Sequence, residues 1–319
     1  MGDRATVRVT SLGFCTPLGP SPADAIASGE SAVRERAELE GLPHRSAASV
    51  EQIPLASVLK RRKDKKLMAR PSQLALAAAA AALEGWTGPR ETLGLFVGVG
   101  REPGDDGESE PALVAAQVDG RVSDQAVAGP CRDLYPPLLP LKTLPNMALA
   151  HVSIHLDVRG ENGAWSGGEA AGLAALRSAI WAVEDGRCSA ALVVAADSWT
   201  SAGAVRDLLR MANGGPIDAP GEAGVALLLE RGDGTSGRSL AEVRVALTPG
   251  VPHATPHRAS LGDSKAADAL MALALTVAAG SGSSHFLAQE GCQAPVGIDL
   301  VMSPDLACYD SPTTESAND

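Results

Sequence analysis

The side chain with the clearest chemical potential is Glu169, which ends the segment Ser166-Gly167-Gly168-Glu169. A short strand-like stretch precedes this segment, and a helix-like run rich in Ala, Leu, Ile and Trp follows it to about Asp185. Paired glycines favour a sharp turn, so the pattern predicts a strand, a tight elbow and a buried helix. A residue at such an elbow lies near the helix N-terminus, where a negative charge is favoured. Glu169 could act there as a general acid or base.

The same residues also fit a purely structural role. Ser166 and Glu169 have the spacing of a capping box, with the serine at the N-cap and the glutamate at N3. Such an arrangement stabilises a helix start by about 1 kcal/mol. The two roles are compatible, and the sequence leaves both open.

A second feature is a basic run at positions 61–66. Its five cations are Arg61, Arg62, Lys63, Lys65 and Lys66, in a chain of formal net charge −11. The run could be a solvated helix start. It could also be a docking patch that attracts an acidic partner.

Other potential ligands are sparse. His151 and His155 stand one helical turn apart, but no third ligand lies near them in the sequence, so we expect structural histidines and no metal site. The five cysteines are scattered and form no CxxC pair, which is typical of a reduced cytoplasmic protein. The acidic balance argues against nucleic acid as a partner, and the sequence has no run long enough for membrane insertion.

Buried strands and apolar helices must position these residues. Residues 93–100 and 188–197 are nearly continuous apolar runs, as in strands covered on both faces. Apolar helices alternate with them, for example over residues 147–156. This alternation places the chain in the α/β class.

Several of these segments resemble the β-ketoacyl synthases, the condensing enzymes of fatty acid and polyketide synthesis. Gly160 and Gly172 have the separation of the first and last glycines in the family's nucleophile elbow. Asn146-Met147-Ala148-Leu149-Ala150-His151 and the strand from Gly221 to Glu230 also match family patterns, in the right order. The resemblance implies a thiolase-like layered α/β fold with a well-matched N-terminal half and a shortened C-terminal half.

The alignment implied by this resemblance places Glu169 where the family has its nucleophilic cysteine. A thiolate attacks an acyl thioester, and a carboxylate offers no comparable chemistry. The resemblance therefore implies a non-condensing subunit similar to a chain-length factor, which pairs with an active ketosynthase through the strand near residues 161–165. The basic run matches the position at which the family docks acyl carrier protein. We expect no resident cofactor, with the phosphopantetheine arm of a carrier protein as a possible ligand.

Two alternatives remain open. The chain could be an acyl-thioester enzyme of the decarboxylase type that uses Glu169, with His253 as a weak match to the first of the family's two histidines; nothing matches the second. It could also be a homodimeric scaffold that binds an acyl chain or carrier protein. We expect a ketosynthase-like half over residues 1–235, a truncated C-terminal half over residues 236–308, and a disordered tail over residues 309–319.

Overall fold

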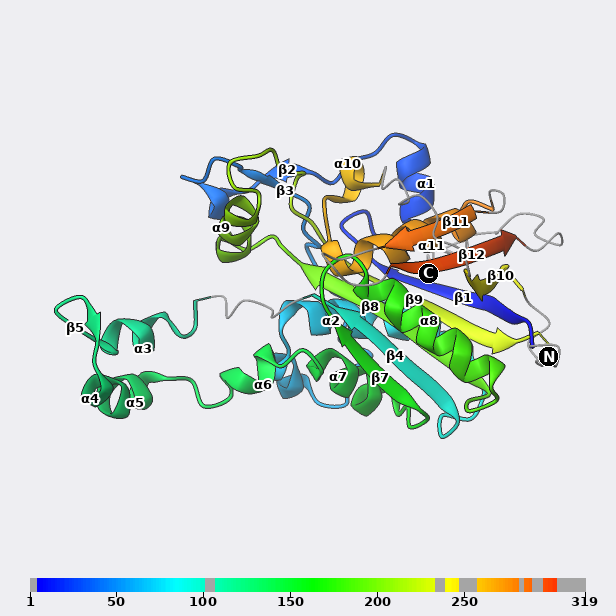
Figure 1. Cartoon of the computed structure of the whole chain (residues 1–319), viewed down its shortest axis with the longest axis horizontal. Coiled ribbons are helices and arrows are strands. Elements are labelled where there is room, and N and C mark those ends of the chain that lie inside the picture. The colour runs from blue at the N-terminus through cyan, green and yellow to red at the C-terminus, as the bar shows by residue number, and fades with distance from the viewer. Residues whose placement is uncertain are drawn as a thin grey trace, which may run out of the picture.

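The computed structural model describes residues 5–100, 107–232, 239–246, 257–280, 284–288 and 295–302. Its centre is one eight-stranded sheet with the order β11-β12-β10-β1-β9-β8-β4-β7 (Figure 1). The strands are β1 (Val7–Cys15), β4 (Leu93–Val99), β7 (Asn162–Ser166), β8 (Ala190–Ser198), β9 (Glu222–Arg231), β10 (Ala241–Val245), β11 (Ser284–Ala288) and β12 (Val296–Met302). The expected α/β class is confirmed.

The sheet is mixed. β4 runs parallel to both β7 and β8, and the remaining neighbours pair in antiparallel fashion. β7 ends the sheet and pairs with β4 alone among the described strands. Its residues alternate between exposed and half-buried, unlike β4, in which every residue is buried. The sheet therefore has a buried centre and an open edge at β7.

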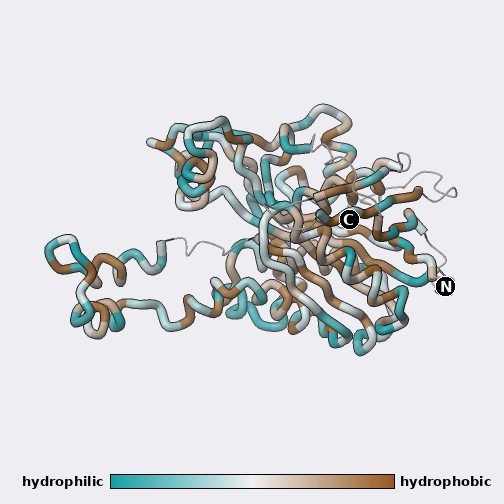
Figure 2. Tube along the Cα trace, viewed as in Figure 1, coloured by the Kyte–Doolittle hydropathy of each residue, from teal (hydrophilic) through white to brown (hydrophobic). Residues whose placement is uncertain are grey.

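Helices cover both faces of the sheet. On one face lie α2 (Arg70–Ala82) and α7 (Met147–Leu156), and on the other lie α8 (Ala171–Glu184) and α11 (Asp268–Ala278). Each face has its own buried apolar cluster, and the brown segments of Figure 2 follow these strands and helices. The result is a three-layer α/β/α arrangement, in which apolar burial on both sides is the main stabilising contribution.

Glycines let α2 approach the sheet closely. A Cβ on Gly13 of β1 would lie 2.1 Å from the carbonyl oxygen of Ala78, and one on Gly224 of β9 would lie 2.4 Å from that of Leu74. Because neither contact leaves room for a side chain, the alanine-rich helix packs with its backbone against these strands.

The shorter elements surround this core. Around it lie α1 (Pro22–Ala27), β2 (Arg34–Glu35), η1 (Ala37–Leu39), β3 (Ser46–Ala47), η2 (Arg62–Leu67), α9 (Ala202–Met211), α10 (Arg258–Leu261) and η4 (Lys265–Ala267). The basic run lies in η2 and just before it, and η4 precedes α11. None of the helices in the described ranges combines the length and apolar character needed to cross a membrane.

A separate arm extends from the body between β4 and α7 (Figure 1). It contains α3 (Glu110–Ala115), β5 (Gln117–Val118), β6 (Arg121–Val122), α4 (Asp124–Ala126), the π-helical turn η3 (Val127–Cys131), α5 (Arg132–Leu134) and α6 (Leu139–Thr143). α3, α4 and α5 pack mainly on one another and on η3, while α6 contacts α7 and η2.

Candidate functional site

The elbow between β7 and α8 is the centre of the candidate site. The backbone N–H of Gly167 donates to the carbonyl of Val99, 3.1 Å away, so the chain leaves the sheet only after Ser166. The N–H of Ala171 then donates to the carbonyl of Gly168 at 3.1 Å, and α8 begins. Glu169 lies in the turn between strand and helix, as the sequence predicted.

The predicted capping box is wrong. The N-cap of α8 is Ala170, and Ser166 is still part of β7, paired with Val99. The Ser166 hydroxyl donates to the carbonyl of Gly100 at 3.3 Å and does not reach the helix. Gly167 and Gly168 are also absent from the positive-φ residues of the described chain, so the turn does not depend on left-handed glycines. Strand pairing takes precedence over the local capping preference of Ser166.

Close packing fixes the start of α8. A Cβ on Gly98 of β4 would lie 2.6 Å from the carbonyl carbon and oxygen of Ala171. A Cβ on Gly172 would lie 3.0 Å from the carbonyl oxygen of Ala266 in η4. The helix start is thus held between the central strand and η4, which brings the segment before α11 close to Glu169.

Glu169 forms ion pairs with two cations from that segment. Its Oε1 lies 2.9 Å from Nη2 of Arg258, which donates a hydrogen bond to it, and 3.7 Å from Nζ of Lys265. The Glu169 side chain is 45% exposed, whereas that of Arg258 is 18% exposed. The carboxylate therefore faces partly outward with its charge balanced from the protein side.

Arg258 is the hub of a larger group, which we call the elbow ion cluster. The cluster contains Glu169, Asp218, Arg258, Asp263, Lys265 and Asp268. Arg258 lies 3.2 Å from Asp218 and 3.6 Å from Asp263, and its Nε donates to the almost fully buried Asp268. Lys265 contacts Asp263 at 2.6 Å.

The buried carboxylates of this cluster are strongly perturbed. Burial and the neighbouring charge of Asp268 raise the pKa of Asp263. Burial opposes ionisation of Asp268, but His257, whose Nε2 lies 3.6 Å from Oδ1, and the charge of Arg258 hold the pKa of Asp268 well below the usual range. The backbone N–H and the hydroxyl of Ser264 both donate to Oδ1 of Asp268, at 2.9 Å and 2.6 Å. Asp268 is therefore a buried anion that needs its partners.

The sequence and the structure agree with a known family. Residues 5–216 match the family described as β-ketoacyl synthase, N-terminal domain. The chain belongs to the β-ketoacyl synthase family. No curated protein matches the sequence.

Solved structures share the thiolase-like ketosynthase fold. The ishigamide ketosynthase/chain length factor has a TM-score of 0.70 at 20% identity, covering 93% of this chain and 99% of the other. A complex of a type II PKS acyl-carrier protein with its ketosynthase bound to the hexaketide (AntDE:AntF) has a TM-score of 0.69 at 13% identity, covering 94% of this chain and 100% of the other. A β-ketoacyl synthase from Burkholderia phymatum STM815 has a TM-score of 0.57 at 18% identity, covering 86% of this chain and 77% of the other. At these identities the likeness shows the shared fold.

The turn between β7 and α8 contains no cysteine. Cys15 and Cys188 are buried, and burial raises the pKa of the first thiol to about 12 and of the second to about 11. Neither belongs to the elbow, so neither is an activated nucleophile there. The group offered at the turn is a carboxylate paired with two cations. His253, the weaker catalytic prediction, lies outside the described residues.

The basic run of this family member rests on α7. The backbone N–H of Lys60 donates to Nδ1 of His155 at 3.2 Å, and Nε2 of His151 lies 3.2 Å from the carbonyl oxygen of Leu67. The two predicted structural histidines thus hold both ends of η2. Within the run, Asp64 is buried and pairs with Arg61 at 3.2 Å, whereas the cations of the run are exposed.

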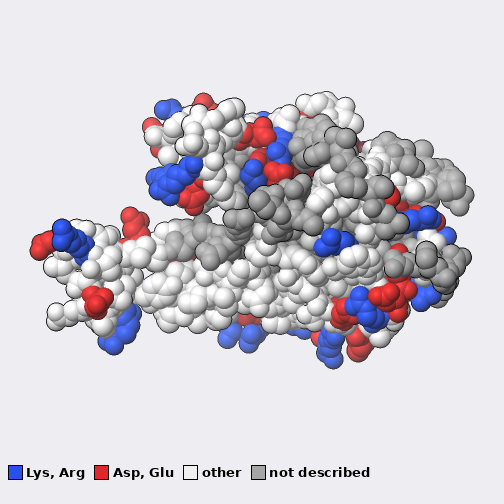
Figure 3. Space-filling model, viewed as in Figure 1, with Lys and Arg blue, Asp and Glu red and all other residues white. Residues whose placement is uncertain are grey.

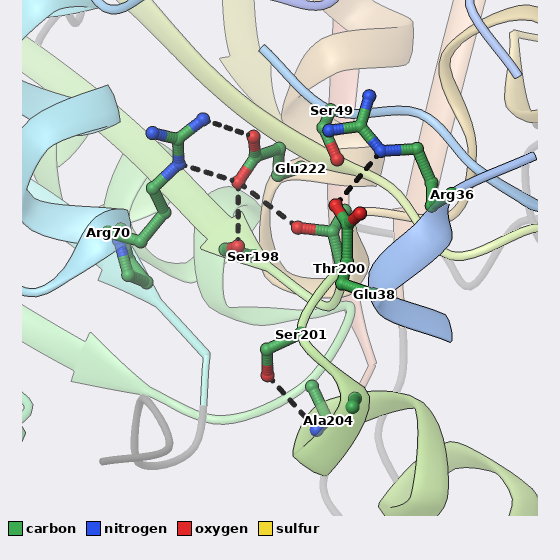
Figure 4. A pocket seen from close by; sticks show the side chains of 11 residues that line it. Arg36, Glu38, Ser49, Arg70, Ser198, Thr200, Ser201, Ala204 and Glu222 are labelled. Carbon is green, nitrogen blue, oxygen red and sulfur yellow. Dashed lines mark hydrogen bonds and ion pairs between the residues drawn. The ribbon is translucent and has the colours of Figure 1, made fainter. Parts of the chain in front are cut away.

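A cavity of about 340 Å³ lies near the carboxyl end of β8 (Figure 4). Its buried carboxylate, Glu222, accepts hydrogen bonds from Arg70, from the Ser198 hydroxyl at 2.7 Å and from the backbone N–H of Val50 at 2.8 Å. These bonds satisfy Glu222 without a ligand. We therefore regard this carboxylate as a structural anchor between α2, β8 and β9.

Sequence reasoning missed Arg258 and Lys265. Neither residue belongs to a motif that the sequence analysis used. Their role depends on a contact that spans 89 positions between Arg258 and Glu169. The one local signal was a concentration of charged residues in an otherwise apolar C-terminal segment.

Proposed function

We propose that this protein is a non-condensing ketosynthase-like subunit of fatty acid or polyketide biosynthesis, similar to a chain-length factor. The observation that carries the proposal is the ion-paired Glu169 carboxylate at the elbow of a β-ketoacyl synthase fold. Arg258 and Lys265 both contact Oε1 of this carboxylate, at 2.9 Å and 3.7 Å, and balance its charge. A thioester would meet an ion-paired carboxylate and no cysteine at this turn.

The open edge of the sheet supports a role as one half of a pair. β7 pairs only with β4 in the described chain, and an exposed edge strand is a template for pairing with another chain. In the view of Figure 3 the surface over the middle of β7 carries few charges, whereas charged side chains gather at its lower right end. A partner strand laid against β7 would continue the sheet across the interface.

The arm offers the apolar surface that such a pair needs. Of the 14 large hydrophobic side chains that are exposed in the described chain, ten lie between Leu113 and Leu144. Val114 is 64% exposed and Val122 is 74% exposed. Exposed apolar groups concentrated in one segment are typical of a protein interface. We infer that the arm lies against the partner subunit.

The basic run supports docking of an acidic carrier protein. Arg62, Lys63, Lys65 and Lys66 are exposed and enter no ion pair with a described residue. Opposite charge on a partner would increase the rate of encounter and orient it. Two structural relatives carry these associations in their descriptions: a ketosynthase/chain length factor and a ketosynthase with its acyl-carrier protein.

The pairing is tested by isolating the tagged protein from its native host and measuring the intact masses of the complex. We expect a ketosynthase at one-to-one stoichiometry. Leu134→Asp, at a side chain of the arm that is 55% exposed, should weaken the pair by about tenfold or more, since it removes apolar burial and adds a charge. Met211→Asp, at a side chain on α9 that is 62% exposed, is the matched control and should leave the pair intact.

A homodimer without any ketosynthase would contradict the proposal and leave the scaffold alternative. The decarboxylase alternative is tested by following carbon dioxide release from a malonyl-carrier substrate. If carbon dioxide release disappears in Glu169→Gln and persists in Glu161→Gln, the protein is an enzyme that uses Glu169. For a non-condensing subunit we expect no carbon dioxide release and no acyl adduct on the intact protein.

A further inference from the structure

Asp197 is a buried carboxyl group near the end of β8, close to the elbow ion cluster. It is 3% exposed. A Cβ on Gly100, which directly follows β4, would lie 2.3 Å from Oδ2 of Asp197, so the backbone at this strand end covers the carboxyl group. The segment η4 covers it as well, because the backbone N–H of Ala266 donates to the same Oδ2 at 3.3 Å. The carboxyl group is therefore kept from water while η4 is in place.

Only uncharged groups bond to Asp197 in the described part of the chain. Besides Ala266, the indole Nε1 of Trp199 donates to Oδ2 at 2.9 Å, and the backbone N–H of Ser198 donates to Oδ1 at 2.9 Å. No cation from the described ranges forms an ion pair with this carboxyl group. A carboxylate that is buried without a cationic partner carries a large desolvation penalty.

The charged groups on the surrounding elements do not balance Asp197. Asp268 at the start of α11 is a second buried carboxylate, and its charge repels that of Asp197. Burial, together with this repulsion, raises the pKa of Asp197 to about 7, although its three hydrogen bonds act in the opposite direction. The other charged groups nearby pair among themselves: Lys265 with Asp263, Arg70 with Glu222, Arg258 with Glu169 and Asp268, and His257 with Asp268.

The segment η4 is the part of this enclosure that can move. It has three residues, and the bond from Ala266 to Asp197 is the one hydrogen bond that joins it to the central sheet within the described ranges. Lys265, its first residue, has a φ of +42°, in the left-handed region that residues with side chains rarely adopt. The closed position of η4 therefore holds a strained backbone over a carboxyl group that has no counter-ion.

The direction of the proton dependence follows from linkage. A hydrated aspartate has a pKa of about 3.9, so the enclosed carboxyl group binds its proton more tightly than a hydrated one does. Protonation therefore favours the closed position of η4. As the pH rises from about 4 to about 7, an opening that hydrates Asp197 becomes more favourable, and above about pH 7 the effect levels off because both forms are ionised.

We propose that Asp197 and η4 form a proton-sensitive latch beside the elbow. With Asp197 neutral, η4 stays closed and keeps Lys265 beside Glu169, 3.7 Å away. With Asp197 ionised, η4 opens more often, water reaches the carboxylate, and Lys265 leaves Glu169. The latch changes the charge around the elbow carboxylate. It uses contacts within this chain alone, so it stands whether or not the protein pairs with a ketosynthase.

The test is hydrogen–deuterium exchange of the full chain at a series of pH values, followed by mass spectrometry of peptides that cover residues 264–268. After correction for the intrinsic base-catalysed rate, the protection of this segment should fall at least about tenfold between about pH 5.5 and about pH 7.5, then level off. Asp197→Asn has no proton to lose at this site, so its protection should not change with pH. Peptides from the centre of β9 provide the internal reference.

The control variant is Asp263→Asn, at a second carboxyl group whose pKa is raised and which contacts Lys265. The fall in protection should persist in this variant. The proposal is overturned if wild type shows no fall, if Asp197→Asn retains it, or if Asp263→Asn alone removes it.

Trp199→Phe is the second variant, for the case that Asp197→Asn cannot be recovered folded. It removes a hydrogen bond that favours the ionised carboxyl group, so the pKa of Asp197 rises further. The pH at which the protection levels off should move upward by a measurable amount. An unchanged pH dependence in Trp199→Phe would also overturn the proposal.

Discussion

Arg258→Met should destabilise the protein far more than the loss of any other cation of the elbow ion cluster. Arg258 contacts Asp268, whose side chain is 1% exposed, and Asp263, whose side chain is 6% exposed. Removal of one partner from a buried ion pair leaves a buried charge uncompensated and costs about 3–5 kcal/mol. Lys265 still contacts Asp263, and Ser264 still donates to Asp268. We therefore expect a loss near the lower end, about 3 kcal/mol.

The outer contacts of Arg258 contribute little to this figure. Glu169 is 45% exposed and Asp218 is 58% exposed, so each pair is screened by water and contributes about 0–1 kcal/mol. Glu169→Gln should accordingly change the free energy of unfolding by less than about 1 kcal/mol. It is the control that keeps Arg258 and removes only an exposed partner.

The assay is urea unfolding followed by tryptophan fluorescence at about pH 7.5, with the slope m checked for each variant. The gap between wild type and Arg258→Met should narrow as the pH falls. Without the arginine the pKa of Asp268 rises, so the folded variant takes up protons in acid and regains stability relative to wild type. Arg258→Lys, which keeps the charge, serves if the methionine variant cannot be recovered folded, and should lose less.

Equal losses in Arg258→Met and Glu169→Gln would refute this reasoning. So would a gap between wild type and Arg258→Met that does not change with pH. Either result would mean that Asp263 and Asp268 do not depend on Arg258 for their charge.

Two further predictions concern the packing around the elbow and η2. Gly98→Ala should lower the free energy of unfolding by about 1–3 kcal/mol, because the new Cβ would lie 2.6 Å from the Ala171 carbonyl. The control is Gly203→Ala at the exposed start of α9, which should be neutral or mildly stabilising. Thermal unfolding of the two variants measures the difference. Burial lowers the pKa of His155, whose Nδ1 accepts a hydrogen bond from the backbone N–H of Lys60. The stabilisation of the fold by neutral His155 is therefore present above about pH 6.5 and is lost as the pH falls through the lowered pKa of the folded state. His155→Gln should therefore show a shallower loss of stability than wild type between about pH 7 and about pH 5, and parallel curves would contradict this assignment.

Local sequence patterns determined the elements of this fold. The helix predicted over residues 147–156 has those bounds in the structure, and the apolar run at residues 93–100 forms the buried central strand β4. The helix expected to run from the elbow to about Asp185 ends at Glu184 with its C-cap at Asp185. Periodicity and continuous apolar runs report burial, which is why these predictions succeed.

The capping prediction shows where local patterns fail. Ser166 has the residue type and spacing of an N-cap, yet its pairing with Val99 keeps it in the strand. The helix begins at Ala171, because packing against Gly98 and η4 fixes that start. A local preference of about 1 kcal/mol cannot displace a chain that is held by the sheet on one side and by close packing on the other.

The sequence by itself determined that a carboxylate stands at the elbow and that a cluster of cations stands at residues 61–66. Only the tertiary structure decided what surrounds them. Arg258 reaches Glu169 across 89 positions, and Lys142 joins Lys65 from the base of the arm. These contacts join loops and short helices that carry no periodic pattern, so they follow from how the layers pack and not from any local preference.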